Sequence, residues 1–177
     1  MNYSFFKNKK ILVTGHTGFK GSWLVTWLNL LGSDVMGISL NPIKGDNHFK
    51  ILKKNLNIID KRGDIRNVNF LKKNIIDFKP DIVFHLAAQA IVSTSYKFPK
   101  KTFETNVLGT LNLLSVLSEL KHKCIAIFIT SDKCYKNIEV SRGYKETDEL
   151  GGDDFYSSSK ASAELVFHSF YKSFIKD

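Results

Sequence analysis

Five short apolar segments alternate with longer segments of helical period, and this alternation constrains the fold more than any other feature of the chain. Strands that alternate with helices are typical of βαβ units and of a parallel sheet. We therefore expect an α/β fold with a doubly wound parallel sheet in three α/β/α layers. The expected strands are residues 9–14, 34–40, 57–60, 81–87 and 124–130, and the expected helices are residues 19–31, 65–78, 100–121 and 155–175.

Three of these strands, residues 9–14, 81–87 and 124–130, are almost continuously apolar. Strands of this kind are typical of sheets that helices cover on both faces, so we expect all three to be buried. In such a fold, ligands bind at the carboxyl ends of the strands, at the point where the strand order reverses.

Three glycines, Gly15, Gly18 and Gly21, recur at intervals of three residues between the first strand and the first helix. Glycine allows positive φ angles and the close approach of a ligand or another backbone. A helix N-terminus presents unpaired N–H groups that bind phosphate. The loop therefore predicts a dinucleotide site, to which Thr17 and Phe19 of the same loop would also contribute.

This loop does not decide between NAD and NADP. Its spacing is G-x-x-G-x-x-G and differs from the common G-x-G-x-x-G. The second strand ends in GISLNP, without the acidic residue that would bind a ribose diol and without an arginine that would favour a 2′-phosphate. Because no ribose acid is evident, we expect the dinucleotide to be held less firmly than at a loop that has one.

Tyr156 and Lys160 lie four residues apart near the start of the last expected helix, so they share one helical face. An ammonium close to a phenol stabilises the ionised phenol, which could then act as a general base toward a substrate hydroxyl. For the pair alone, a surface tyrosine beside a solvated lysine is the simpler interpretation. Within a nucleotide-binding fold, the catalytic interpretation is favoured.

A second polar cluster, Ser131, Asp132 and Lys133, directly follows the fifth strand. A hydroxyl, a carboxylate and an amine at the carboxyl end of a strand could bind a substrate and transfer protons, although an ordinary polar strand exit would look the same. His85 is interpreted as a strand residue with a hydrogen-bonded ring. No metal is expected, because no second histidine or carboxylate lies at metal-ligand spacing from it.

Charge and apolar pattern narrow the class of protein. The formal net charge is +9, but the lysines form short scattered groups without interleaved aromatic residues, so no nucleic-acid partner is expected. The sequence contains neither a signal-peptide core nor an apolar run long enough to span a membrane, which predicts a cytoplasmic protein without a membrane partner. The two cysteines, Cys124 and Cys134, predict reduced thiols.

Five stretches together resemble a known family: GHTGFKGSWL, FHLAAQA, FETNVLGT, TSDKCY and GGDDFYSSSKASAE. They are similar to the extended short-chain dehydrogenase/reductases that modify nucleotide sugars, and more narrowly to the CDP-glucose 4,6-dehydratases. The resemblance implies a Rossmann domain that holds NAD, followed by a smaller domain that holds the nucleotide sugar. It also implies a homo-oligomer when full length and a place in the synthesis of deoxysugars for polysaccharides such as O-antigen.

The resemblance also implies roles for individual residues. Tyr156 would take the proton of the sugar 4-hydroxyl, with Lys160 supporting it and holding the nicotinamide ribose. Ser131 would belong to the same catalytic group, Asp132 would protonate the departing 6-hydroxyl and Lys133 would be the base at C5. The cofactor-binding residues implied beyond the glycine loop are Asp64, Ile65, Leu86, Ala87, Ala88, Asn106, Tyr156 and Lys160.

The overall reaction implied is the conversion of CDP-glucose to CDP-4-keto-6-deoxyglucose. The alternatives are an epimerase or reductase of the same superfamily, which would need only Tyr156 and Lys160, and a catalytically inactive NAD-binding fragment. Members of the family continue well beyond the length of this chain. We therefore expect residues 1–177 to form an incomplete NAD-binding domain that lacks the substrate domain, is inactive alone and leaves residues 124–130 near a bare sheet edge.

Overall fold

A computed structural model describes residues 3–42 and 47–176, and the chain divides into two compact units. The first unit comprises the residues up to Ala87 together with Glu119–Ile129. The second comprises Ala88–Ser118 and the residues from Thr130 onward. The expectation that the whole chain forms one NAD-binding domain stays a prediction, and each unit is described by itself.

The first unit is built on a parallel five-stranded sheet with the order β3-β2-β1-β4-β5. The strand order reverses between β1 and β4, which pair directly with each other. This order confirms the doubly wound sheet expected from the sequence. The strands are β1 (Lys10–Thr14), β2 (Asp34–Ser39), β3 (Ile58–Arg62), β4 (Ile82–His85) and β5 (Ile125–Phe128).

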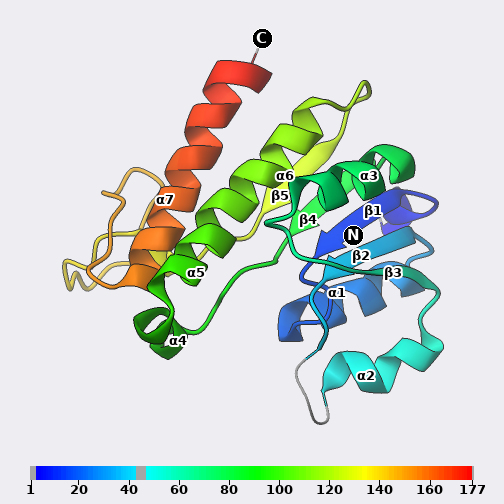
Figure 1. The fold of residues 1–177 in the computed structure, drawn as a ribbon, viewed down its shortest axis with the longest axis horizontal. Coiled ribbons are helices and arrows are strands. Elements are labelled where there is room, and N and C mark those ends of the chain that lie inside the picture. Colours follow the sequence, from blue (N-terminus) through cyan, green and yellow to red (C-terminus); the bar gives the residue numbers. More distant parts are fainter. Residues whose placement is uncertain (1–2, 43–46, 177) are drawn as a thin grey trace. The chain divides into compact units, whose positions relative to one another are not determined.

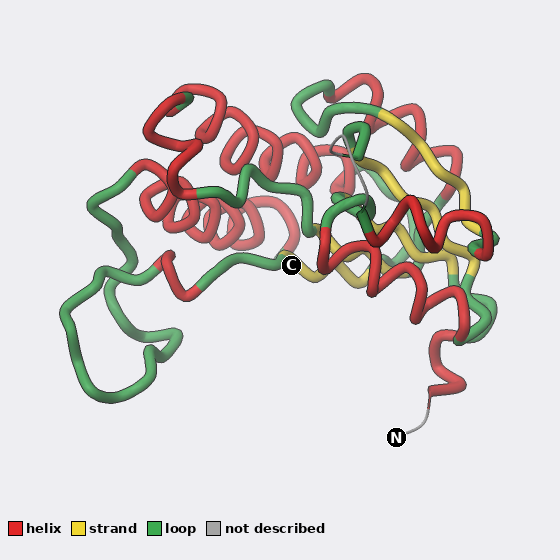
Figure 2. Tube along the Cα trace, turned by 90° about the horizontal axis from the view of Figure 1, so that it is seen from below, coloured by secondary structure: helices red, strands yellow, loops and turns green. Residues whose placement is uncertain are grey.

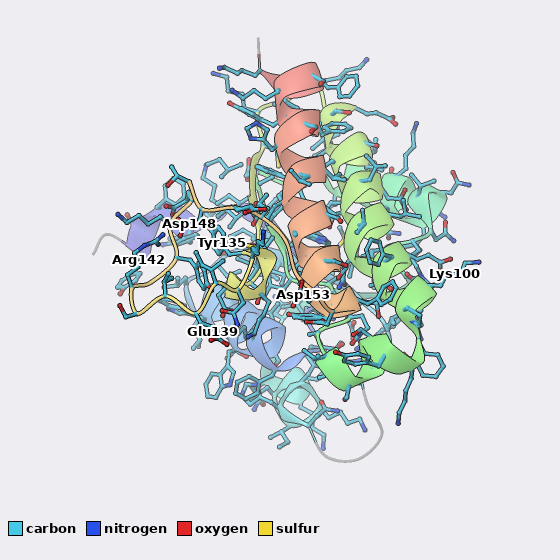
Figure 3. All side chains as sticks on the ribbon, turned by 90° about the vertical axis from the view of Figure 1, so that its left-hand side faces the viewer. Lys100, Tyr135, Glu139, Arg142, Asp148 and Asp153 are labelled. Atoms are coloured by element: carbon cyan, nitrogen blue, oxygen red, sulfur yellow. The ribbon has the colours of Figure 1, made fainter. Side chains whose placement is uncertain are left out.

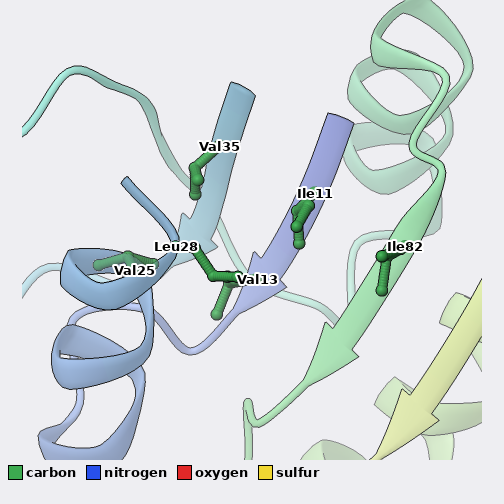
Figure 4. Packing of buried hydrophobic residues seen from close by; sticks show 6 residues of the cluster. All are labelled: Ile11, Val13, Val25, Leu28, Val35 and Ile82. Atoms are coloured by element: carbon green, nitrogen blue, oxygen red, sulfur yellow. The ribbon is translucent and has the colours of Figure 1, made fainter. Parts of the chain in front are cut away.

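Two helices cover opposite faces of this sheet: α1 (Phe19–Leu30) lies on one face and α3 (Val68–Phe78) on the other (Figure 1). Right-handed crossovers that leave β1 toward β2 and β3 toward β4 require this arrangement, and it gives three layers. Figure 4 shows how α1 meets the sheet through a buried apolar cluster. Its members are Ile11, Val13, Val25, Leu28, Val35 and Ile82.

Shorter helical segments complete the first unit. They are η1 (Tyr3–Phe6), α2 (His48–Leu52) and η2 (Lys53–Asn55). The sequence analysis did not predict α2, because five residues are too few to show a helical period. Asn47 caps this helix by accepting a hydrogen bond from the backbone of Lys50.

The prediction that residues 124–130 are buried on both faces is wrong. β5 forms the edge of the sheet, and Ile125, Ile127 and Ile129 are 54%, 38% and 40% exposed. These three residues alternate along the strand and therefore share one face of the sheet, and that face is exposed at β5. The bare edge itself was expected, and β1 and β4 are buried as predicted.

The second unit consists mainly of helices, which Figure 2 draws in red. α7 packs against α5 and α6. A π-helical turn separates α5 from α6, a feature that the sequence did not predict. The elements are α4 (Val92–Lys97), α5 (Pro99–Phe103), the π-turn η3 (Glu104–Leu108), α6 (Gly109–Ser118), η4 (Asp132–Cys134), α7 (Phe155–Phe170) and the π-turn η5 (Tyr171–Ile175). Among the described residues of either unit, no helix is both long and apolar enough to cross a bilayer.

Candidate functional site

The loop between β1 and α1 lies at the point where the strand order reverses. Gly15 has a φ of +76°, and a Cβ on it would lie 2.8 Å from the backbone nitrogen of Ala87. A Cβ on Gly21 would lie 2.2 Å from the carbonyl oxygen of Gly15. The protein's own backbone packing therefore requires glycine at positions 15 and 21.

Gly18 differs from the other two glycines. Its φ is −73°, and its Cβ would meet one atom of the described protein, the Gly15 carbonyl oxygen at 3.3 Å. Gly18 is also the N-cap of α1, and because glycine has no side chain, it leaves the N–H groups of the first turn uncovered. The loop therefore fits the diphosphate of a dinucleotide, which these N–H groups and the helix dipole would bind.

Thr14 and His85 connect the ends of β1 and β4. The Thr14 Oγ1 lies 2.7 Å from the His85 Nδ1, and it accepts a hydrogen bond from the backbone N–H of Ala87. The backbone N–H of Leu86 donates to the Thr14 carbonyl. These bonds fix the predicted cofactor residues Leu86 and Ala87 beside Gly15, and they confirm that the ring of His85 has a hydrogen-bond partner. Ala88, partly buried, is the first residue of the second unit.

A partly buried network of ion pairs and hydrogen bonds connects this loop to β3. The Nε2 of His16, which is fully buried, is 2.9 Å from the Asp60 carboxylate. Lys53 and Arg62 reach the other oxygen of that carboxylate at 2.9 and 2.8 Å. Burial lowers the pKa of His16, although the hydrogen bond and charge of Asp60 act in the opposite direction. Burial would raise the pKa of Asp60, but Lys53, His16 and Arg62 outweigh it and lower the pKa.

The end of β2 is more polar than its sequence indicates. Arg62 donates a hydrogen bond from Nη1 to the Leu40 carbonyl at 3.1 Å, so an arginine does stand at this strand end, although it comes from β3. The hydroxyl of Thr17, a residue predicted to contact the cofactor, lies 2.7 Å from the hydroxyl of Ser39. Ser39 of β2 pairs with Arg62 of β3, and the sequence of one strand does not show which residue of the neighbouring strand lies beside it.

The remaining predicted residues of the first unit have contrasting environments. Phe19 is 77% exposed at the start of α1, and Ile65 is 4% exposed. Asp64 accepts hydrogen bonds from the backbone and guanidinium of Arg66. A carboxylate held in this way has a fixed position after β3, the position at which the resemblance places the adenine contact.

In the second unit, Tyr156 and Lys160 are both buried in the first turns of α7, with 8% and 6% of their surface exposed. Asp154 caps this helix: its carboxylate accepts hydrogen bonds from the backbone N–H groups of Tyr156 and Ser157 and from the Ser157 hydroxyl. Burial would raise the pKa of Asp154, but these hydrogen bonds and the charge of Lys133 lower it. The cap thus fixes the turn that carries Tyr156.

Asn106 joins three parts of the second unit from within the π-turn η3. Its Oδ1 accepts a hydrogen bond from the Gln89 backbone at 2.8 Å. Its Nδ2 donates to the Gln89 carbonyl and to the Ser159 hydroxyl. Because the Ser159 hydroxyl donates in turn to the Tyr156 carbonyl, the predicted supporting residue is linked to the turn of Tyr156.

The cluster Ser131, Asp132 and Lys133 forms the start of η4, which contacts α7. Ser131 caps η4 by accepting from the Lys133 backbone, and its hydroxyl donates to the Asp132 carboxylate at 3.1 Å. Asp132 and Lys133 are exposed. The preceding residue, Thr130, donates a hydrogen bond to the Glu164 carboxylate on α7. Sequence reasoning missed Glu164, and only its helical spacing of four from Lys160 could have indicated it.

A long loop between η4 and α7 is held by its own contacts (Figure 3). Arg142 donates two hydrogen bonds to the Asp148 carboxylate, at 2.7 and 2.8 Å, and this lowers the pKa of Asp148 to about 2. The rings of Tyr135 and Tyr144 stack at 5.3 Å between centroids. The loop therefore has a defined structure on the amino-terminal side of α7.

A doubly wound parallel sheet with flanking helices and a glycine turn at the strand reversal defines a Rossmann-like protein of the short-chain dehydrogenase/reductase type. Residues 12–175 match the family described as GDP-mannose 4,6 dehydratase, and the chain belongs to this family.

Relatives and solved structures agree with this assignment. The chain is 45% identical over 171 residues to CDP-glucose 4,6-dehydratase of Salmonella typhimurium, covering 97% of this chain and 48% of that protein. It superposes with a TM-score of 0.79 on dTDP-glucose 4,6-dehydratase of Bacillus anthracis in complex with NAD, with 27% identity over 94% of this chain and 51% of the other. A UDP-glucose 4-epimerase of Thermus thermophilus in complex with NAD gives a TM-score of 0.79, with 28% identity over 93% and 51% of the two chains. The chain spans about half the length of these relatives.

Proposed function

We propose that the chain supplies the NAD-binding part of a nucleotide-sugar 4,6-dehydratase that acts on CDP-glucose. The observation that carries the proposal is that the second unit combines Tyr156 and Lys160 with the cluster Ser131–Lys133. The first pair would supply the base for oxidation of a sugar hydroxyl by NAD, and the second group would supply the acid and base that an elimination needs.

The glycine loop supports the choice of a dinucleotide. Gly18 leaves the first turn of α1 open to a diphosphate, and Gly15 and Gly21 shape the turn that presents it. When bound, NAD would accept the hydride from C4 of the sugar and later return it to C6. The NAD complexes of the structural neighbours from Bacillus anthracis and Thermus thermophilus support NAD over NADP.

Tyr156 is proposed to remove the proton from the sugar 4-hydroxyl. Tyr156 is buried, and Lys160, on the same helical face, would stabilise the phenolate. Asp154 and the Asn106–Ser159 chain hold the turn in which Tyr156 lies, so they are proposed as positioning residues.

The elimination of water from C5 and C6 is proposed for the polar cluster after β5. Once C4 is a ketone, the hydrogen at C5 becomes acidic, and the neutral amine of Lys133 would remove it as a proton. Asp132 would donate a proton to the departing 6-hydroxyl, while the Ser131 hydroxyl, hydrogen-bonded to Asp132, would orient that carboxyl group. The 45% identity to CDP-glucose 4,6-dehydratase supports both this reaction and the substrate.

Epimerisation is the alternative, since it needs only Tyr156 and Lys160 and since a UDP-glucose 4-epimerase is among the structural neighbours. The two reactions differ in their products, because a dehydratase product has lost one water and an epimerase product keeps its 6-hydroxyl. A chimera tests both: this chain is joined to the remaining half of the Salmonella typhimurium relative and incubated with NAD and CDP-glucose, dTDP-glucose or GDP-mannose. Mass spectrometry should show loss of water from CDP-glucose alone.

Two variants of the chimera make this experiment specific. Tyr156→Phe should abolish all turnover, whereas Asp132→Asn should slow the loss of water at least about a hundredfold. Absence of any loss of water from CDP-glucose would refute the proposed reaction. A product of unchanged mass but inverted configuration would refute the dehydratase and establish the epimerase.

A further inference from the structure

Arg62 brings a guanidinium to the carboxyl end of β2, although the residue belongs to β3. Ser39, the last residue of β2, lies about twenty residues beyond the glycine loop, where an acidic residue would bind the ribose diol of NAD. The carbonyl of the next residue, Leu40, accepts a hydrogen bond from Arg62 at 3.1 Å and one from the Thr17 hydroxyl at 3.2 Å. The glycine loop, the end of β2 and Arg62 therefore meet at this carbonyl group.

Contacts with three residues position the guanidinium of Arg62. It lies over the Phe49 ring, 5.1 Å from the ring centroid, and it donates from Nη2 to the Asp60 carboxylate at 2.8 Å. With the bond from Nη1 to Leu40, two of its five N–H groups are used, and the other three have no hydrogen bond within the described part of the chain. The side chain is 26% exposed. Arg62 is therefore a cation that is already positioned and that a ligand can still reach.

Asp60 does not cancel the positive charge at this strand end. Lys53 and Arg62 both bind its carboxylate, at 2.9 and 2.8 Å, so two cations surround one anion. His16, which also binds Asp60, is uncharged at neutral pH because burial lowers its pKa. One positive charge therefore remains. An acid at the end of β2 would repel a 2′-phosphate, whereas this group of side chains attracts one.

We propose that Arg62 and Lys53 bind the 2′-phosphate of NADP, so that this chain accepts NADP as well as NAD. The unused N–H groups of the guanidinium suit phosphate oxygens, and Lys53, which is 57% exposed, adds a second positive charge. These contacts offset the hydration that the phosphate loses on binding. The inference rests on the dinucleotide site proposed above and is independent of the reaction, for which NAD stays the proposed cofactor.

Calorimetric titration of the 177-residue chain with NAD, NADP, 5′-AMP and 2′,5′-ADP tests the proposal without any turnover. The two adenosine phosphates differ only in the 2′-phosphate, so this pair isolates its contribution from that of the nicotinamide half. We expect NADP to bind within about threefold of NAD or more tightly, and 2′,5′-ADP to compare with 5′-AMP in the same way.

Variants of the two basic residues locate the contact. Arg62→Met should weaken the binding of 2′,5′-ADP and of NADP at least about tenfold, because hydrogen bonds from a charged group are lost. Methionine can still pack on Phe49, so the affinity for 5′-AMP should stay within about twofold of that of the wild type. Lys53→Met should weaken 2′,5′-ADP by a smaller factor, since solvent screens its exposed ammonium. Thermal unfolding of each variant establishes that it is folded.

Two further variants complete the set. Lys54→Met removes the same charge from an exposed neighbour of Lys53 and is the matched control, so the affinity for neither adenosine phosphate should change. Ser39→Asp introduces an acid at the end of β2, and it should weaken the binding of NADP at least about tenfold relative to that of NAD.

The proposal fails if the wild type binds NADP more than about threefold more weakly than NAD, and this result would leave the proposed NAD site intact. It also fails if Arg62→Met weakens 5′-AMP and 2′,5′-ADP equally, because Arg62 would then only support the structure of the strand ends. Equal losses in Lys54→Met and Arg62→Met would show non-specific attraction by the net charge. Binding of neither dinucleotide would refute the dinucleotide site and this proposal with it.

Discussion

Replacement of Gly15 by alanine should destabilise the first unit strongly, whereas the same replacement at Gly18 should not. The Gly15 Cβ would lie 2.8 to 2.9 Å from three backbone atoms of Leu86 and Ala87, and the φ of +76° is unfavourable for alanine. The left-handed conformation costs about 1–2 kcal/mol. Displacement of the tightly packed end of β4 costs about 1–3 kcal/mol more. We expect a loss of about 3 kcal/mol in the free energy of unfolding.

At Gly18 the φ of −73° suits alanine, and the Cβ would meet one oxygen at 3.3 Å. We therefore expect Gly18→Ala to change the free energy of unfolding by less than about 1 kcal/mol. It should nevertheless weaken NAD binding at least about tenfold, since the added methyl group lies against the N-terminus of α1, where the diphosphate is proposed to bind.

Urea unfolding followed by tryptophan emission at submicromolar protein measures the first unit, because both tryptophans are on α1. NAD titration by calorimetry provides the second readout. The reasoning is refuted if Gly15→Ala is as stable as the wild type, or if Gly18→Ala is as unstable as Gly15→Ala. Unchanged NAD affinity in Gly18→Ala would refute only the assignment of the phosphate site and would leave the stability argument intact.

Three further predictions concern residues that hold the site together. Asp154→Ala should lower the free energy of unfolding by about 1–2 kcal/mol through loss of the α7 cap, whereas Asp153→Ala, an exposed neighbour, should have little effect in the same urea titration. Glu164→Ala should speed hydrogen exchange of the backbone around Thr130, and equal exchange in both proteins would show that their hydrogen bond contributes nothing. In the wild type, stability should fall as pH drops below about 6.5, because the unfolded chain binds a proton at His16 that burial excludes in the folded state. His16→Gln should remove this part of the slope below about pH 6.5, and an unaltered slope would contradict the assignment.

The sequence predicted the sheet well because the strands alternate with helices of clear period. It misjudged the burial of β5, since an apolar run does not reveal whether a strand is central or at the edge. The position of Arg62 was also missed, because the residue reaches Leu40 from the neighbouring strand. Contacts between strands depend on register, which a single sequence does not specify.

The sequence analysis assigned all three glycines to a dinucleotide loop, in which glycine allows the close approach of a ligand or of another backbone. The backbone around Gly15 and Gly21 requires glycine at both positions. The proposed contact of Gly18 with the diphosphate stays a prediction. Motifs predicted Tyr156, Lys160 and the cluster Ser131–Lys133 as candidate site residues. The sequence analysis missed Asp154, which caps the turn of Tyr156, and Glu164, which binds Thr130, because caps and tertiary hydrogen bonds have weak sequence signals.

The π-turn Glu104–Leu108 has a consequence for how this chain can vary. A π-turn holds one residue more than an α-helical turn, so a regular helix that kept the same side-chain register beyond it would contain one residue fewer. Conversion of the turn to α-helix at unchanged length would rotate everything beyond it by about 100°, carrying Leu113 and Leu114 out of the core. A chain without the π-turn should therefore be one residue shorter in this segment, and the residue count should stay constant wherever the π-turn and the Asn106 link are kept.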